Sequence, residues 1–337
     1  IIWDRVIFDE AHHLRNSNTE KFRNSNRLKA RIKWLVTGTP IQNKFQDFVN
    51  LCSIAGIKRK IYGDESAWKT YSNYFLLRRT KQQVGIDLKG VTKTNCIVGW
   101  KNNKEMKLSK EIHSLLPNQT YVNANQKYKL ANCFGKGGIL TALLRAKQSC
   151  VFPALMKKNI KQFSQQGMIS NELVEALKYT SKLDAAIDLM LERKDNGKGK
   201  IIFCHFHKEI DMISERLLKG GMEKVVTYDG RNSGGKNLSI LAEPADALVF
   251  QIQTGCEGLN LQEHFSEIYF VSPHWNPFVE EQAIARCHRI GQKEDVNIFK
   301  FEMSGFNKNE ENMDTISLEK YINKVQDNKR EISDKIL

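Results

Sequence analysis

Short runs of apolar residues, each ending in polar or turn-forming residues, mark the first part of the chain. Apolar runs at residues 5–8 and 34–36 lead into an acidic sequence and into Thr-Gly-Thr-Pro, and residues 47–55 have amphipathic helical spacing. Buried strands of a parallel sheet have such short continuous apolar runs. The pattern predicts two parallel strands and a helix within residues 1–57.

The same rhythm returns after residue 179. Further strands are predicted at residues 200–203, 225–227, 247–250 and 268–271, and helices at 183–191, 210–218 and 280–290. Strands that alternate with helices indicate a parallel sheet with covering helices. The sequence therefore predicts an α/β fold with a parallel sheet in each of two regions.

The segment between these regions has a different composition. It is rich in Lys, Asn and Gln, has few strand patterns, and shows helical apolar spacing at residues 172–177. The polar tail has a weaker helical pattern at 316–325. We expect an α/β region, a helical segment, a second α/β region and a helical tail at residues 1–95, 96–178, 179–303 and 304–337.

The charge of the chain points toward a polyanionic partner. Its 337 residues include 52 Lys and Arg against 38 Asp and Glu, a net charge of +14. Nucleic acid is the leading candidate, and a solvated lysine-rich surface is an equal alternative on charge alone.

Cysteine usage and hydropathy further limit the classes of protein to which the chain can belong. The seven cysteines include no CxxC, which disfavours a zinc ribbon or a disulfide framework and favours a reducing compartment. His205 and His207 could share a metal, but ligand sets normally need three or four members. No apolar run approaches the roughly 20 residues of a membrane span. We expect no membrane partner and an intracellular protein, nuclear if eukaryotic and otherwise cytoplasmic, nucleoid-associated or viral.

Two adjacent carboxylates, Asp9 and Glu10, follow the first predicted strand. The carboxyl ends of parallel strands face the ligand crevice, where adjacent carboxylates are costly unless a cation compensates them. Mg²⁺ bound to nucleotide phosphates suits this position. Asp9 would hold the metal through water, and Glu10 would orient and deprotonate an attacking water. A surface turn with the same letters is the alternative.

Thr37, Gly38 and Thr39 follow the second predicted strand. Two hydroxyls beside a glycine can link the acidic pair to a part that moves when phosphate leaves. A plain strand-ending turn is the alternative. Because both strand ends belong to one predicted sheet, we assign a coupling role to this turn.

Arg286 and Arg289 lie three residues apart on the predicted helix 280–290, so both side chains should point the same way. Paired guanidinium groups can clamp a γ-phosphate and stabilise charge in the transition state. The alternative is that the two arginines form a solvated basic helix face. Gln282 and the Gly-Gln at residues 291–292 disfavour that alternative.

A glycine turn follows the predicted strand 247–250. Gly255 and Gly258 would let the backbone approach a phosphate closely. A tight strand-to-helix turn is the alternative.

These four features, taken in their order along the chain, resemble superfamily 2 helicases and, more narrowly, the Snf2 family of DNA translocases. The strings that carry the narrower resemblance are DEAHHLRN (9–16), TGTPIQN (37–43), FLLRRTK (75–81), LLRAKQSCVFPAL (143–155), TGCEGLNL (254–261) and HWNPFVEEQAIARCHRIGQ (274–292). The last is the most specific, because Trp-Asn-Pro followed by QAxxRxxRIGQ is similar to Snf2 proteins and unlike DEAD-box or DEAH-box RNA helicases. The resemblance covers residues 1–305.

The resemblance implies two RecA-like lobes that sandwich ATP and Mg²⁺, with a Snf2-specific helical insertion between them. Residues 1–95 would be the C-terminal part of the first lobe, 96–178 the insertion or linker and 179–303 the second lobe. The implied activity is ATP-driven tracking along the minor groove of double-stranded DNA, on nucleosomes or other protein-bound DNA. The implied nucleotide-site residues are Asp9, Glu10, His12, Gly255, Gly258, Gln282, Arg286 and Arg289.

The resemblance also implies candidate DNA contacts. Gln253, Thr254 and Trp275 would lie near DNA by their matching position. Arg78, Arg79 and Lys81 would be either phosphate contacts or braces between the lobes.

The sequence departs from the family in three places. It has no phosphate-binding GxGKT before the acidic pair, and the cluster at residues 135–138 lacks the following Ser or Thr and the preceding strand. Cys256 stands where a second glycine is usual, and Ser272 where an Asp often occurs. Because the chain begins at Ile1, inside a predicted strand, we expect an upstream start and an N-terminally truncated motor that is inactive alone.

The expected function is thus that of a Snf2-type double-stranded DNA translocase and DNA-dependent ATPase, in chromatin remodelling, repair or transcription. A strand-separating superfamily 2 helicase is one alternative. A non-catalytic DNA-binding scaffold built on a decayed motor is the other, although the retention of Asp9, Glu10, Arg286 and Arg289 disfavours it.

Overall fold

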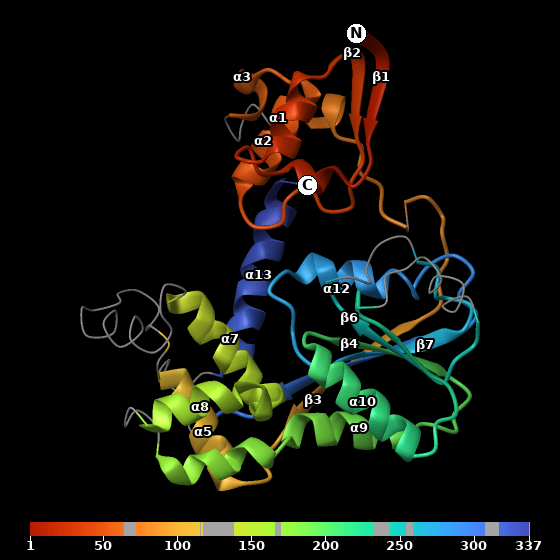
Figure 1. Ribbon diagram of the computed structural model, residues 1–337. Helices are drawn as coiled ribbons and strands as arrows, with labels where there is room; N and C mark the ends of the chain where they lie inside the picture. Colours follow the sequence, from red (N-terminus) through yellow and green to blue (C-terminus); the bar gives the residue numbers. More distant parts are fainter. Residues whose placement is uncertain are drawn as a thin grey trace. The chain divides into compact units, whose positions relative to one another are not determined.

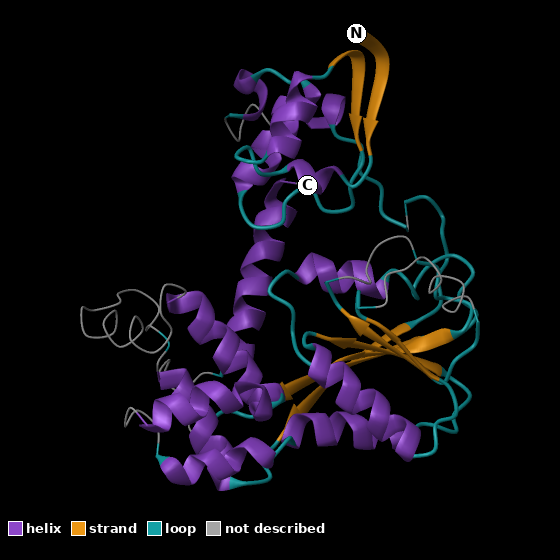
Figure 2. Ribbon diagram, viewed as in Figure 1, coloured by secondary structure: helices purple, strands orange, loops and turns teal. Residues whose placement is uncertain are grey.

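A computed structural model describes most of the chain in two compact units (Figures 1 and 2). The described residues are 1–63, 72–81, 83–114, 116, 138–165, 170–231, 243–253, 259–306 and 317–336. The small unit comprises residues 1–87, 275–280 and 325–337, and the large unit comprises 88–274 and 281–324. The chain therefore enters the small unit three times.

The small unit contains a parallel pair of strands with helices between and after them. Its elements from the N-terminal segment are β1 (Ile2–Phe8), η1 (Ala11–Leu14), α1 (Glu20–Arg27), β2 (Lys29–Leu35), α2 (Phe45–Ala55) and α3 (Arg59–Tyr62). The pairing register sets Ile7 opposite Trp34. The strands and the amphipathic helix predicted from the apolar pattern are confirmed.

The apolar core of the small unit lies beside α2 rather than on the strands. Phe48 and Cys52 of α2 pack with Ile41 and Tyr62 in a buried cluster. By contrast, the aromatic ring of Trp34 on β2 is about half exposed. The prediction of buried strands is therefore wrong for this sheet, because it has only two strands among the described residues and much of its apolar surface lacks a packing partner.

The large unit is built on a six-stranded sheet in which every pairing is parallel. The strand order is β3-β8-β7-β4-β6-β5. The strands are β3 (Val91–Val98), β4 (Gly199–Cys204), β5 (Val225–Tyr228), β6 (Ala247–Gln251), β7 (Phe265–Phe270) and β8 (Val296–Met303). The predicted α/β class with parallel sheets is confirmed.

Neither β3 nor β8 was predicted from the apolar pattern. Strand β3 pairs along its full length with β8, and it crosses the expected boundary at residue 95. Its sequence, VTKTNCIV, is mostly polar, and most of its side chains are exposed at the edge of the sheet. An edge strand with little burial has no continuous apolar run to reveal it.

The two faces of this sheet have different packing partners. Ile202 on β4 and Val249 on β6 pack with α9 (Ser181–Glu192) and α10 (His207–Lys219), which Figure 1 shows along one side of the sheet. On the opposite face, Phe203 stacks on Phe250 and Phe270, with ring centroids 5.8 and 5.2 Å apart. Both faces are buried, as parallel sheets require.

The segment predicted to be mostly helical forms a helical cluster in the large unit. Its described helices are α5 (Asn103–Ser114), α7 (Gly138–Val151), η3 (Pro153–Met156), α8 (Lys157–Gln165) and η4 (Asn171–Lys178). Helices α12 (Pro277–Ile284) and α13 (Leu318–Ile336) follow later in the chain. Among the described residues, no helix combines the length and apolarity that crossing a bilayer requires.

The first turn of α13 is held by polar contacts in the large unit. Glu319 forms an ion pair with Lys182, and both side chains are fully buried. Glu319 Oε2 also accepts the Met303 N–H at 2.8 Å. His113 on α5 adds a neutral contact: its Nδ1–H donates to the Ser109 carbonyl at 2.7 Å, and its Nε2 accepts the Leu318 N–H at 3.1 Å.

Burial lowers the pKa of His113 to about 4, from an ordinary value of 6.5. Between these values the unfolded chain binds the proton and the folded chain does not. We therefore expect the free energy of unfolding to carry this contribution fully above pH 6.5 and to lose it as pH falls toward 4. The loss is on the order of 3 kcal/mol.

Urea unfolding at several pH values measures this contribution. His113→Gln should flatten the pH dependence between pH 6.5 and 4, and the same substitution at the exposed His13 should not. Equal pH dependence in the wild type and His113→Gln would show that this histidine is not responsible.

Candidate functional site

Two backbone hydrogen bonds bring the loops after β1 and β2 together. The Val36 N–H donates to the Phe8 carbonyl at 2.9 Å, and the Ala11 N–H donates to the Val36 carbonyl at 2.9 Å. These bonds continue the parallel pairing past the ends of the strands. As a result, the sequence-predicted acidic pair and the threonine turn occupy the same edge of the small unit.

The backbone at Glu10 has an uncommon conformation. Its φ of 45° and ψ of 46° lie in the left-handed region, and it is the one non-glycine residue with positive φ among those described. Such a conformation costs on the order of 1 kcal/mol or more and is concentrated at functional sites. The turn is closed by the Glu10 N–H, which donates to Asp9 Oδ1 at 2.8 Å.

His12 connects the acidic pair to the threonine turn. Its side chain is buried, and its Nδ1 lies 3.1 Å from Glu10 Oε2 and 3.2 Å from Thr37 Oγ1. Thr37 Oγ1 in turn accepts the Thr39 N–H at 3.1 Å. A single imidazole nitrogen is thus shared by a carboxylate and the hydroxyl that shapes the next loop. Gly38, between the two threonines, is exposed.

Further residues that sequence reasoning missed hold these loops in place. Asp47 Oδ2 on α2 accepts the backbone N–H of Asn43 at 2.8 Å, with longer contacts to its neighbours 42 and 44. Arg15 Nη1 donates to the His12 carbonyl at 2.9 Å, and Asn50 Nδ2 donates to the Arg15 carbonyl at 2.6 Å. An acidic residue three positions into a helix is a capping signal that could have identified Asp47.

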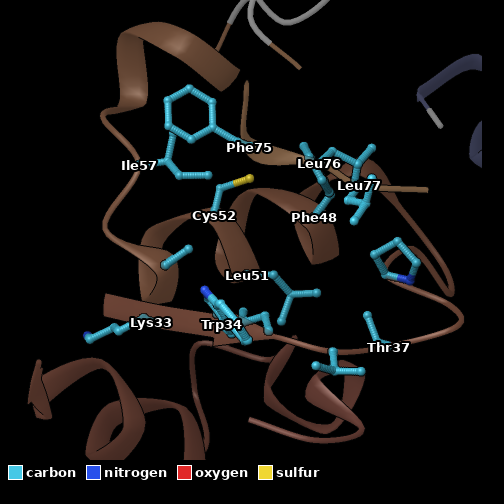
Figure 3. A pocket seen from close by; sticks show the side chains of 14 residues that line it. Lys33, Trp34, Thr37, Phe48, Leu51, Cys52, Ile57, Phe75, Leu76 and Leu77 are labelled. Atoms are coloured by element: carbon cyan, nitrogen blue, oxygen red, sulfur yellow. The ribbon is translucent and has the colours of Figure 1, made fainter. Parts of the chain in front are cut away.

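An apolar cavity of about 520 Å³ lies next to the threonine turn (Figure 3). Its wall includes Thr37, Trp34 on β2, Cys52 on α2, and residues 75–77. Burial raises the pKa of the Cys52 thiol to about 12, so this cysteine is an inert wall residue rather than a nucleophile. The cavity separates the threonine turn from the segment that precedes Arg78.

The acidic pair fits a magnesium ion bound to a nucleotide. Asp9 is exposed, and the Glu10 side chain is 36% exposed, so carboxylate oxygens face solvent at the end of β1. The described residues contain no group of three or more His, Cys, Asp and Glu side chains arranged to hold a metal. A cation here would therefore need phosphate or water oxygens as well, as Mg²⁺ usually does.

The histidines considered as metal ligands have other neighbours. The His207 Nδ1 lies 3.5 Å from the Asp229 carboxylate. His205 stacks on His274 with ring centroids 5.8 Å apart.

The arginine pair lies in a series of turns, not on a helix as predicted. Helix α12 ends at Ile284, and the Arg286 carbonyl accepts the Leu261 N–H at 3.1 Å. Arg289 Nη1 donates to Asn260 Oδ1. The helical prediction through residue 290 is wrong because contacts to a loop distant in sequence replace the next helical turn. Gln282 remains on α12 and is half-buried.

A glutamine and a glycine fix the end of this arginine turn. Gln292 Nε2 donates to the Phe265 carbonyl at 3.0 Å and the Cys287 carbonyl at 3.2 Å. Gly291 has a φ of 96°, which a residue with a side chain rarely adopts. The Gly-Gln pair in the sequence therefore has a structural role in the large unit.

The candidate DNA contacts differ in exposure. Arg78, Arg79 and Lys81 are exposed in a loop that turns at Thr80, whose N–H donates to Gln83 Oε1 at 2.8 Å. Gln253 is exposed after β6, and Trp275 is half-buried before α12. The remaining candidate DNA contact, Thr254, and the candidate nucleotide-site glycines, Gly255 and Gly258, lie outside the described residues.

Comparisons with known proteins match both regions of the chain. The SNF2-related domain matches residues 1–155, and the helicase conserved C-terminal domain matches 181–291. A probable global transactivator of Orgyia pseudotsugata multicapsid polyhedrosis virus is 27% identical over 99% of this chain and 66% of its own length. An uncharacterised ATP-dependent helicase of Mycoplasma pneumoniae is 27% identical over 88% of this chain and 28% of its own length.

Among solved structures, the Sulfolobus solfataricus SWI2/SNF2 ATPase core in complex with double-stranded DNA is 23% identical, with a TM-score of 0.45. It covers 90% of this chain, which covers 64% of that structure. This chain thus spans less than two thirds of the length of each of these proteins, and only just less for the viral one. The family matches contain the acidic pair, the threonine turn and the arginine turn. The chain belongs to the Snf2 family of superfamily 2 ATP-dependent helicases and translocases.

Proposed function

We propose that this chain forms the ATP-hydrolysing part of a double-stranded DNA translocase. The observation that carries the proposal is the His12 contact, which joins the Glu10 carboxylate to the Thr37 hydroxyl at the carboxyl ends of two parallel strands. A carboxylate held in this way can act as a base. Because His12 also contacts Thr37, a change at the carboxylate can affect the threonine turn. ATP use by the family supports the assignment.

The proposed roles of the acidic pair follow from their surroundings. Bound ATP with Mg²⁺ supplies the γ-phosphoryl group that is transferred to water. Asp9 would hold the metal through a water molecule. Glu10 would orient the separate water that attacks the γ-phosphate and would accept its proton. The buried His12 imidazole would hold the Glu10 side chain in place. Its hydrogen bond with Thr37 would change when Glu10 gains or loses a proton.

The arginines have a proposed role in the same reaction. Arg286 and Arg289 would stabilise the negative charge that develops on the transferred group. Arg289 would exchange its present hydrogen bond with Asn260 for a phosphate oxygen. Such an exchange costs little, because an exposed neutral acceptor is replaced by a charged one.

The proposed grip on DNA is electrostatic and independent of sequence. Arg78, Arg79 and Lys81 are exposed together in one loop and carry three positive charges. Gln253 and Trp275 would add contacts from the second region, and nucleosomes or other DNA-bound proteins would be the cargo. Phosphate contacts of this type make binding strongly dependent on salt.

Nucleotide binding also needs a phosphate-binding loop, and no GxGKT occurs in the 337 residues. We therefore propose that this chain alone has negligible ATPase activity. The experiments on ATP below use protein expressed from the complete coding sequence.

The role of Glu10 can be tested with Glu10→Gln, which keeps the shape of the side chain but removes the base. We expect DNA-stimulated ATPase to fall by about 10²-fold or more, with ATP and DNA binding retained. Glu20→Gln, an exposed change at the start of α1, is the matched control and should turn over like the wild type. Wild-type turnover in Glu10→Gln would remove Glu10 as the base.

The role of the loop cations can be tested by DNA binding at several salt concentrations. The triple variant Arg78→Ala, Arg79→Ala, Lys81→Ala should lower the slope of log affinity against log salt. We expect a decrease of about 1 for each side chain that binds a phosphate in the wild type.

A second triple variant with the same change in net charge provides the control. Lys107, Lys110 and Lys158 are exposed on α5 and α8. Their replacement by Ala should change the slope less. Equal slopes in the two triple variants would contradict a specific role for the loop.

A further inference from the structure

One face of helix α13 holds the segment at residues 275–280 at two points. Lys329 Nζ donates to the Trp275 carbonyl at 2.9 Å, and Gln326 Nε2 donates to Glu280 Oε1 at 2.9 Å. Gln326 and Lys329 are three residues apart, so they project from the same side of the helix. Glu280 and Gln326 are both buried. These contacts tie α13 to the segment through its backbone and through a buried carboxylate.

The same stretch of α13 packs against α2 in the small unit. Ile332, three residues beyond Lys329, packs on the buried cluster that contains Phe48 and Cys52. The charges of Asp47 and Arg15 both act on the Lys329 ammonium group, whose pKa is lowered chiefly by burial. Lys329 thus binds the Trp275 carbonyl from the same helix whose Ile332 packs on the α2 cluster.

Those two charged residues are the ones that hold the candidate catalytic loops. Asp47 accepts the backbone N–H of Asn43, just after the threonine turn, and Arg15 donates to the carbonyl of His12. Helix α13 thus holds the Trp275 carbonyl through Lys329 and packs through Ile332 on the cluster of α2, the helix whose Asp47 supports the threonine turn. All the residues involved belong to the small unit.

We propose that Lys329 is a positioning residue that couples the Trp275 segment to the loops bearing Glu10 and Thr37, so that DNA contact at Trp275 accelerates hydrolysis at Glu10. The proposal rests on the proposed function. It goes beyond that function because it assigns DNA stimulation to a residue of the C-terminal helix that touches neither nucleotide nor DNA. The physical basis is a series of contacts that runs from the Trp275 carbonyl through Lys329 and Ile332 of α13 to the buried cluster of α2.

Three variants of Lys329 separate coupling from simple support. Lys329→Met removes the charge and the donor while keeping the apolar stem that packs in the interior. Lys329→Arg keeps both the charge and the donor. Lys329→Gln keeps a neutral donor, and it replaces the methionine variant if that protein does not fold. Lys324→Met makes the same change at an exposed position of the same helix.

The measurement is steady-state ATPase with and without double-stranded DNA, on protein from the complete coding sequence. Lys329→Met should lower the DNA-stimulated kcat by about tenfold, with the KM for DNA within about twofold of the wild type. Lys329→Gln should lower that kcat less than Lys329→Met does. Lys329→Arg should recover most of the stimulation, and Lys324→Met should match the wild type.

Several results would overturn the proposal. Full DNA stimulation in Lys329→Met would show that the contact is not needed. If Lys329→Met does not fold, full DNA stimulation in Lys329→Gln would show the same. Equal decreases in kcat with and without DNA, together with a lowered melting temperature, would show support of the fold alone. Absence of DNA stimulation in the wild type would instead refute the proposed function, and the coupling with it, before any variant is compared.

Discussion

The parallel pairing of β1 with β2 is the constraint on which the candidate site depends. Once those strands align, the Val36 N–H reaches the Phe8 carbonyl, and the Ala11 N–H reaches the Val36 carbonyl. The loops that follow must then share one edge, and His12 can contact both Glu10 and Thr37. A shift of either strand by one residue would turn its side chains to the opposite face and separate these groups.

The strain at Glu10 has meaning only within this arrangement. A left-handed glutamate is unfavourable in isolation, and it persists here because the Asp9 carboxylate and the pairing of Ala11 with Val36 fix the turn. The buried imidazole of His12 then limits where the Glu10 carboxylate can lie. Helix α2 contributes from the other side, since Asp47 and Asn50 hold the backbone on both flanks of the site. Local strain and tertiary contacts thus specify the same geometry.

The apolar pattern was sufficient to predict most strands, because central parallel strands such as β4 and β6 are buried on both faces. It did not reveal β8, in which polar residues interrupt the apolar ones, or β3, whose polar residues form an edge. It also did not reveal the exposure of Trp34 on a two-stranded sheet. The acidic pair and the threonine turn were placed together correctly by the rule that parallel strand ends share an edge.

The contact between His12 and Thr37 could not be predicted from sequence spacing because it joins two loops through tertiary structure. The helix prediction for residues 286–290 was wrong for the same reason. The Arg286 carbonyl accepts the Leu261 N–H, and the Gln292 side chain donates to the Phe265 carbonyl, both distant in sequence. Local propensity specifies neither of these contacts, so tertiary packing decides the conformation.

The proposed reaction requires Arg286 to bind the γ-phosphate of the ATP whose hydrolysis Glu10 would assist. Nucleotide affinity in a Glu10→Gln background, on protein from the complete coding sequence, tests it most directly, because ATP then stays intact. We expect the addition of Arg286→Ala to weaken ATP binding by about tenfold or more and to leave ADP binding unchanged, since the proposed charge-assisted hydrogen bond of this arginine would form only with ATP. Equal affinities for ATP with and without the arginine would contradict it.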